Sequence, residues 1–242
     1  MRQQPSKILV WDAPVRVFHW LMVLSFAGAY LTAESERWRL VHVSLGYTMG
    51  GLVAFRILWG LMGTRYARFS SFVRGPAAVM RYLWSLRSGK PEHSVGHNPA
   101  GAVAIVLLLL TSVAIVATGW AAFNAVGGNW VEELHEGAGN AMLAVVAVHI
   151  AGVVLASRLH GENLVRSMLT GRKEGVPNEG IHRAWGGLAV LLLAAVLGFW
   201  CLQWQGAPSG TAAPTPEAAQ YRERAPMMGT EHPETQDAHS AG

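Results

Sequence analysis

Residues 135–156 read HEGAGNAMLAVVAVHIAGVVLA, an apolar run with one histidine at its start and another well inside it. The run is close to the roughly 20 residues that an α-helix needs to cross a hydrocarbon core of about 30 Å. His135 and His149 are 14 residues apart, which on a helix is a rise of about 21 Å and a rotation within roughly 40° of whole turns. One membrane helix is therefore predicted to present two imidazoles on one face, one at each membrane level.

Four further apolar segments of similar length accompany this run, at residues 15–32, 40–62, 100–123 and 185–202. The chain is 51% hydrophobic and only 14% charged, which is too few ionic residues for a soluble globule of this size. We therefore predict an all-α integral membrane protein with five spans. A signal peptide is an alternative for the first segment, but charged and polar residues crowd its start and no convincing cleavage site follows it. We expect the segment to be retained as a span.

Lysine and arginine are distributed unevenly between the connections, and this distribution predicts the orientation. Two connections carry an excess of basic residues and should be cytoplasmic, with Arg65, Arg68, Arg74, Arg81, Arg87 and Lys90 in the first and Arg158, Arg166, Arg172, Lys173 and Arg183 in the second. Residues 34–39 are charge-balanced, and residues 123–133 hold Glu132 and Glu133 with no base, so both connections should lie outside. The N-terminus is then cytoplasmic and the C-terminus outside. The net charge of +4 follows from this topology, and no binding to nucleic acid is expected.

Four histidines lie within or at the mouths of the predicted spans: His19, His42, His135 and His149. An imidazole at membrane depth is costly without a partner, and a lone one is more often a hydrogen-bonded packing residue than a ligand. These four, however, fall at two depths. His19 is about one turn into the first span at the cytoplasmic side, and His42 begins the second span at the outer side. The rise along the helix then pairs His42 with His135, and His19 with His149.

Two facing imidazoles at one depth inside a helix bundle suit a six-coordinate haem iron. Zinc fits less well, because it needs three or four ligands gathered together. The single Cys201 and the absence of a C-x-x-C-H motif exclude covalent attachment of haem. Three glycines one or two turns from the outer pair either leave room for a flat porphyrin or allow close helix packing, namely Gly46, Gly50 and Gly139.

Other polar residues near the spans allow two interpretations. Several arginines could pair with haem propionates or could serve as orientation and snorkelling charges: Arg16, Arg56 and Arg158 on the cytoplasmic side, Arg37 and Arg39 outside. His97, before the third span, is the main alternative ligand to His19 or His149. The remaining histidines receive no role, with His93, His160 and His182 in loops and His232 and His239 in the tail.

Several stretches taken together resemble one family. These are VWDAPVRVFHW at 10–20, HVSLGY at 42–47, RILWGLMGTRYARF at 56–69, GHNPAG at 96–101 and LHE at 134–136. They resemble the bacterial cytochrome b561 and nickel-hydrogenase b-type cytochrome family over about residues 8–173. The resemblance implies a four-helix transmembrane bundle that binds two haems b non-covalently through His19, His42, His135 and His149. It also makes His97 less attractive as a ligand.

The resemblance suggests a division of the chain. Residues 1–13 would be a cytoplasmic N-terminal segment, and 14–173 the four-helix di-haem core. Residues 174–204 would form a cytoplasmic linker and a fifth C-terminal transmembrane helix, and 205–242 a disordered periplasmic tail, rich in proline and acidic residues. The expected location is the bacterial inner membrane, as a multi-pass protein in contact with lipid.

The function implied is electron transfer between the quinone pool and a periplasmic redox partner, such as a c-type cytochrome or a hydrogenase. The sequence does not fix the direction of electron flow. One alternative is a self-contained quinone oxidoreductase that acts on a small molecule such as superoxide, which would make the chain an enzyme in its own right. Another is a non-redox membrane anchor whose histidines only hydrogen-bond or relay protons.

Overall fold

The computed structural model describes residues 6–88 and 95–206. Five of its helices are long and apolar enough to cross a membrane: α1 (Ala13–Thr32), α2 (Arg39–Met62, preceded by the 3-10 helix η1, Glu36–Trp38), α5 (Pro99–Phe123), α6 (Asn129–His160) and α8 (Gly186–Gly206). The five predicted spans are confirmed. His93, His232, His239 and the tail from residue 207 lie outside the described residues.

Helix α6 begins at Asn129, six residues before the predicted start of the fourth span. The apolar run does not reveal this first part, because Glu132 and Glu133 interrupt it. Acidic residues are nevertheless favoured in the first turns of a helix, where they meet the positive end of the helix dipole. As a result His135 lies within α6 and not at its first residue.

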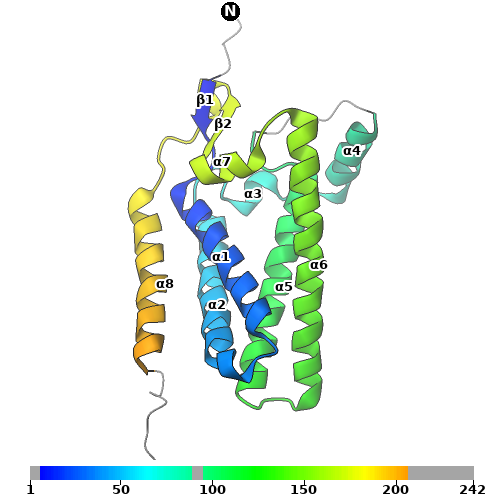
Figure 1. Ribbon diagram of the computed structural model, residues 1–242. Coiled ribbons are helices and arrows are strands. Elements are labelled where there is room, and N and C mark those ends of the chain that lie inside the picture. Colours follow the sequence, from blue (N-terminus) through cyan, green and yellow to red (C-terminus); the bar gives the residue numbers. More distant parts are fainter. Residues whose placement is uncertain (1–5, 89–94, 207–242) are drawn as a thin grey trace, which may run out of the picture. The chain divides into compact units, whose positions relative to one another are not determined.

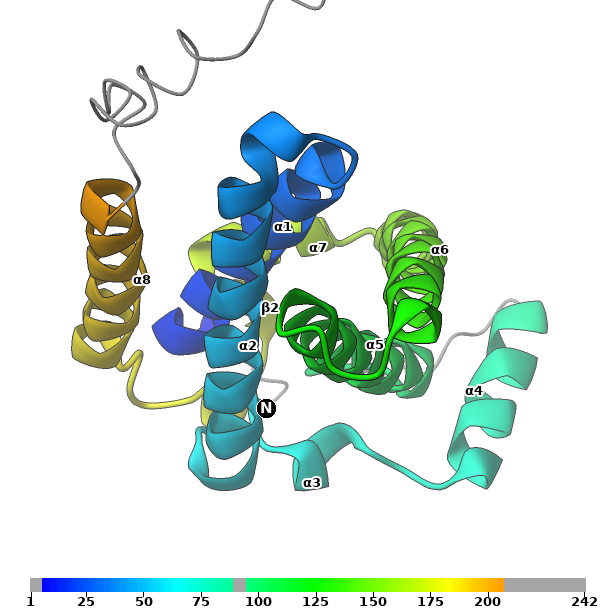
Figure 2. The same cartoon turned by 90° about the horizontal axis from the view of Figure 1, so that it is seen from below.

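Four of the five long helices pack into one bundle, and the fifth helix lies beside it. The most extensive contacts are those of α5 with α6 and of α1 with α2, followed by α2 with α5. Figure 2 shows α8 beyond α1 and α2, away from α5 and α6. Val196 of α8 packs against Leu21 and Leu52, and the Nε1–H of Trp200 donates to Thr48 Oγ1 at 2.8 Å. The core bundle is therefore α1, α2, α5 and α6.

Short elements gather at one end of the bundle (Figure 1), which we call the platform end. They are β1 (Ser6–Leu9), α3 (Phe69–Phe72), α4 (Pro76–Arg87), α7 (Leu164–Thr170), β2 (Arg172–Gly175) and the 3-10 helix η2 (Pro177–Glu179). We call the opposite end, with the α1–α2 and α5–α6 connections, the hairpin end. None of the platform elements was predicted from the sequence.

The two strands tie the N-terminal segment to the chain that follows α6. They pair antiparallel, with Leu9 opposite Arg172, and the N–H groups of Val10 and Trp11 both donate to Gly171 O, at 2.8 and 3.0 Å. Gly171 has φ +78°, and a Cβ there would lie 2.7 Å from Trp11 O. Only glycine suits both the backbone conformation and the close approach. The pairing also spans the predicted boundary at residue 173.

Asp12 joins the platform ends of α1 and α2. It is buried, and its Oδ1 caps α1 by accepting from Val15 N at 2.8 Å. Its Oδ2 accepts from Trp59 Nε1 at 3.1 Å and from Thr64 Oγ1 at 2.6 Å. One carboxylate thus satisfies three donors from three parts of the chain.

We expect Asp12→Ala to lower the free energy of unfolding by about 2–4 kcal/mol, because it removes a helix cap and leaves two buried donors unpaired. Thermal loss of the folded state in detergent, followed by circular dichroism, measures the effect. Glu36→Ala is the matched control, because Glu36 makes only an exposed ion pair with Arg39. Equal melting temperatures for the two variants would contradict the role given to Asp12.

Candidate functional site

His42 of α2 and His135 of α6 lie side by side near the hairpin end. Their ring centroids are 6.0 Å apart and the rings are nearly perpendicular, at 86°. Both side chains are half-buried. First-row metals bind imidazole nitrogen at about 2.0–2.1 Å, so two imidazoles on one metal ion have ring centres about 6 Å apart. The spacing therefore fits two axial ligands of one iron.

Backbone carbonyls orient both rings. His42 Nδ1 lies 2.9 Å from Ala29 O of α1, and His135 Nδ1 lies 3.1 Å from Ile115 O of α5. A carbonyl oxygen can only accept, so each Nδ1 carries the hydrogen and each Nε2 keeps a free lone pair. This arrangement, one ring nitrogen bonded to a carbonyl and the other available, is usual for histidines that bind a metal. Thr118 Oγ1, 3.1 Å from His135 Nδ1, adds a further contact.

The glycines near this pair divide into two kinds. A Cβ at Gly46 or Gly139 would meet nothing within 4 Å, so packing does not require glycine there and space remains beside the histidines. A Cβ at Gly50 would lie 3.1 Å from Val116 Cγ1, so this glycine serves the close packing of α2 against α5. A Cβ at Gly119 would lie only 2.8 Å from His135 Cε1. No pattern in the sequence distinguishes Gly119 from the other glycines of the spans.

His19 of α1 and His149 of α6 form the second pair, toward the platform end. Both are half-buried, and the two rings are electrostatic neighbours. The Nδ1 atom of His19 is buried and has no hydrogen-bond partner among the described residues. Helices α1 and α6 are not among the helix pairs with extensive packing in the described chain. A buried nitrogen without a partner, between two helices that pack loosely, fits a site for a bulky group such as haem.

His97 lies just before α5, between two aromatic rings. Its ring centroid is 4.4 Å from that of Trp11 and 4.7 Å from that of Phe72, and its Nδ1 is buried without a partner in the described chain. Burial, helped by the nearby cations Arg56 and Lys173, lowers the pKa of His97 to about 3. The ring is therefore neutral at neutral pH. His97 is also an electrostatic neighbour of His149, which agrees with its ranking as the main alternative ligand.

Two cations are held in place around His97. Arg56 is 3% exposed, donates to Ala67 O at 3.1 Å and lies 4.8 Å from the ring centroid of Phe69. Lys173 is buried, and its Nζ lies 3.0 Å from Glu162 Oε2 and 3.1 Å from Val95 O. Because Lys173 is already paired with Glu162, Arg56 is the cation here that suits a further carboxylate, such as a haem propionate, at the platform end.

The other arginines considered from the sequence differ in their surroundings. Arg16 donates from Nη1 to Leu169 O at 2.6 Å, but its Nε is buried without a partner in the described chain. At the hairpin end, Arg39 forms an exposed ion pair with Glu36 at 3.9 Å, and Arg37 stacks on Trp38. Within residues 6–88 and 95–206, no group of three or more His, Cys, Asp and Glu side chains could hold a metal ion.

These features define a membrane protein of the b-type cytochrome class, with paired histidines between transmembrane helices. The family profile described as prokaryotic cytochrome b561 matches residues 10–171, and the chain belongs to this family. The match confirms the resemblance seen in the sequence. A membrane b-type cytochrome with haem b and a role in electron transfer follows from this membership.

Relatives with curated names agree with this assignment. The chain is 29% identical over 153 residues to the probable Ni/Fe-hydrogenase 1 B-type cytochrome subunit of Escherichia coli strain K12, covering 51% of this chain and 65% of that protein. It is 24% identical over 216 residues to the probable Ni/Fe-hydrogenase B-type cytochrome subunit of Rhodobacter capsulatus, covering 69% of this chain and 82% of that one. The chain thus spans just under two thirds of the Escherichia coli relative. No solved structure matches the chain.

We expect Gly119→Ala to disturb the pair of His42 and His135 selectively, because the added methyl would force the His135 ring to move. Haem content per chain should fall, measured as pyridine haemochrome against protein mass. Gly152→Ala on α6 is the control, since a Cβ there meets nothing within 4 Å. Unchanged haem content and an unchanged low-spin signal in electron paramagnetic resonance would show that Gly119 does not position His135.

Proposed function

We propose that the protein carries two haems b and moves electrons between them across the bacterial inner membrane. His42 and His135 would hold one haem at the hairpin end, and His19 and His149 the other toward the platform end. The observation that supports this most strongly is the first pair, with ring centroids 6.0 Å apart and both Nδ1 atoms bonded to carbonyls. An anchor without a redox role would not need two neighbouring imidazoles whose Nδ1 atoms are both held by carbonyls and whose Nε2 atoms are left available.

The spacing of the pairs suits electron transfer. His135 and His149 lie 14 residues apart on α6, which separates the two proposed sites by about 21 Å along the helix axis. Two histidines at each site would leave no position on the iron for a substrate, so each haem would serve as an electron carrier. Arg16 and Arg56 would lie near the propionates toward the platform end and would raise the potential of that haem, because positive charge stabilises the propionate anions and the reduced iron.

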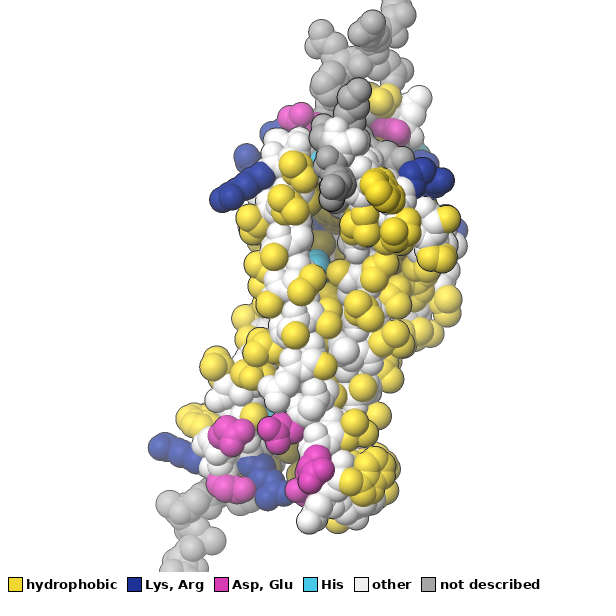
Figure 3. Space-filling model, turned by 90° about the vertical axis from the view of Figure 1, so that its right-hand side faces the viewer, with side chains coloured by type: hydrophobic (Ala, Val, Ile, Leu, Met, Phe, Trp, Pro, Cys, Tyr) yellow, Lys and Arg dark blue, Asp and Glu magenta, His cyan; other side chains and the backbone are white. Residues whose placement is uncertain are grey.

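The distribution of charge supports the proposed orientation. Figure 3 shows a broad apolar band with charged side chains gathered at the two ends of the molecule. The basic connections accompany the platform end, which we therefore assign to the cytoplasm, with the N-terminus there and the C-terminus in the periplasm. At the hairpin end, α6 begins with exposed Glu132, Glu133 and Glu136, which suit a periplasmic redox partner with a basic face, such as a c-type cytochrome.

The second partner would be the quinone pool, reached within the membrane. The curated relatives are named as cytochrome subunits of Ni/Fe-hydrogenases, which supports a redox enzyme as one partner for this chain as well. In this electron-transfer pathway the cytochrome would connect a periplasmic protein to a quinone dissolved in lipid. Electrons would pass between the two histidine pairs in either direction.

A visible spectrum of the purified protein, before and after dithionite, with a pyridine haemochrome count tests the proposal. We expect two haems b per chain, because each histidine pair supplies a complete set of axial ligands. Expression with an added haem precursor ensures an adequate supply. A yield well below two under these conditions would refute the di-haem proposal.

Single substitutions assign the ligands. His135→Ala and His19→Ala should each remove about one of the two haems, because the two sites share a helix but no ligand. His97→Ala should keep both haems, since its ring packs between Trp11 and Phe72 on the platform side. Loss of a haem in His97→Ala with retention in His19→Ala would reverse the assignment of the second pair. Haem counts and redox titration of each variant show whether His19 or His97 is the second ligand at the platform-end site.

A further inference from the structure

Helix α4 has an apolar outer face in addition to the face that it packs against α5. On the packed face, Tyr82 is 1% exposed and Val79 is half-buried. On the outer face, Met80 is 54% exposed, Leu83 44% and Trp84 64%. These three side chains lie within about 100° of the helix circumference, because successive residues are about 100° apart. A helix that met water on this side would carry polar residues there.

The chain around α4 carries only positive charge. Residues 63–91 contain six arginine and lysine residues and no aspartate or glutamate. Arg81 flanks the outer apolar face, and Arg74, two residues before the helix begins, is exposed. A short basic helix with tryptophan on its apolar face is typical of helices that lie on an anionic membrane surface. With 12 residues, α4 is also too short to cross the hydrocarbon core.

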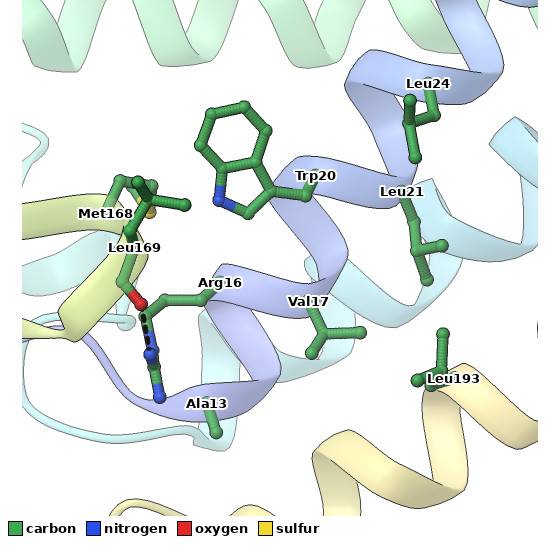
Figure 4. Close-up of a pocket in the computed structure, with 9 residues that line it drawn as sticks. All are labelled: Ala13, Arg16, Val17, Trp20, Leu21, Leu24, Met168, Leu169 and Leu193. Atoms are coloured by element: carbon green, nitrogen blue, oxygen red, sulfur yellow. Dashed lines mark hydrogen bonds between the residues drawn. The ribbon is translucent and has the colours of Figure 1, made fainter. Parts of the chain in front are cut away.

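Contacts with the bundle place α4 at the depth where a span begins. The side chain of Tyr82 is hydrogen-bonded to that of Asn98, and Asn98 caps α5 by accepting from Gly101 N at 2.7 Å. Helix α7 is placed in a similar way, because Arg16 in the first turn of α1 donates to Leu169 O at 2.6 Å (Figure 4). Both short helices therefore lie at the level of span ends, which is the head-group region of a bilayer.

Among the described elements, only α5 packs extensively against α4. The helix stands at the edge of the bundle, on the side away from α8 (Figure 2). Figure 3 faces this side of the molecule, and hydrophobic and basic side chains lie near one another there toward the platform end. Whatever covers the apolar outer face must therefore come from outside the described chain.

We propose that α4 is a membrane-surface helix that binds anionic phospholipid of the cytoplasmic leaflet. Met80, Leu83 and Trp84 enter the boundary between head groups and acyl chains, and Arg74 and Arg81 lie at the level of the phosphates. Charge and polarity together select this occupant, because a lipid surface offers apolar chains beside negative head groups. The inference goes beyond the proposed function and uses only the assignment of the platform end to the cytoplasm.

The depth of α4 is measured with a spin label at Met80→Cys. The haem-loaded full chain carries Cys201→Ser, which removes its single, exposed cysteine, and is placed in nanodiscs of phosphatidylcholine and phosphatidylglycerol. The label should collide more often with oxygen, which concentrates in lipid, than with a water-soluble nickel chelate. A label at Glu174→Cys, exposed on β2, is the aqueous reference and should show the opposite preference. If both labels prefer the nickel chelate, α4 faces water and the proposal is wrong.

The preference for anionic lipid is measured by native mass spectrometry of the full chain, titrated with phosphatidylglycerol or phosphatidylcholine. Each arginine at an anionic surface contributes about fivefold to affinity. Arg74→Gln with Arg81→Gln should therefore weaken the binding of phosphatidylglycerol more than tenfold and leave that of phosphatidylcholine unchanged. Arg37→Gln with Arg39→Gln removes the same charge from exposed positions at the hairpin end and should bind as wild type. An equal loss in the two double variants would show that total charge, and not α4, attracts the lipid.

A second copy of the chain is the other occupant that these measurements detect. Dipolar broadening between Met80→Cys labels on neighbouring chains would show that a copy covers the face, and would overturn the proposal. The double variants are compared at equal haem content, and the depth measurement changes no arginine, so it still decides if a variant folds poorly. Neither measurement involves electron transfer, so a negative result here leaves the proposed function unaffected.

Discussion

The proposed sites depend on the fixed rise of a single helix. Because α6 is continuous from Asn129 to His160, the depth and direction of His135 determine those of His149, and no flexible connection separates the two. The partner histidines come from α1 and α2, which run in opposite directions and place His19 and His42 at opposite ends. Any change that bent or rotated α6 would misplace both pairs at once. The four-helix arrangement therefore serves to hold α1 and α2 at the correct distance from one rigid element.

Helix α5 has no histidine in its span, yet it prepares the site at the hairpin end. Ile115 O fixes the hydrogen of His135 on Nδ1, and Gly119 allows the ring to lie against the helix. Helix α1 does the same for His42 through Ala29 O. These acceptors are carbonyls that already belong to regular helices, so the orientation of both rings follows from helix packing and needs no additional polar side chain in the membrane.

The sequence predicted the spans because membrane helices have a strong local signal in their apolar length. Constant helix rise also placed His42 and His135 at one depth, where their rings lie side by side. The sequence could not predict the platform. Strands β1 and β2 are four residues each and pair across more than 160 residues of sequence, with no alternation that reveals them. The buried role of Asp12 likewise depends on Trp59 and Thr64, which approach it only after folding. Gly46 and Gly50 looked alike in sequence, and only the position of Val116 distinguishes them.

The two ends of the bundle differ in a way that bears on their tasks. At the hairpin end, the Nδ1 atoms of both histidines are hydrogen-bonded. The surface around them is formed by short loops with exposed acidic residues. Such a surface is suited to contact with another protein. Toward the platform end, buried nitrogens of Arg16, His19, Trp20 and His97 have no partner in the described chain, and Arg56 and Lys173 are buried as cations. Buried donors without partners are costly, and a haem propionate would relieve part of that cost. The platform would then complete the surroundings of the second haem.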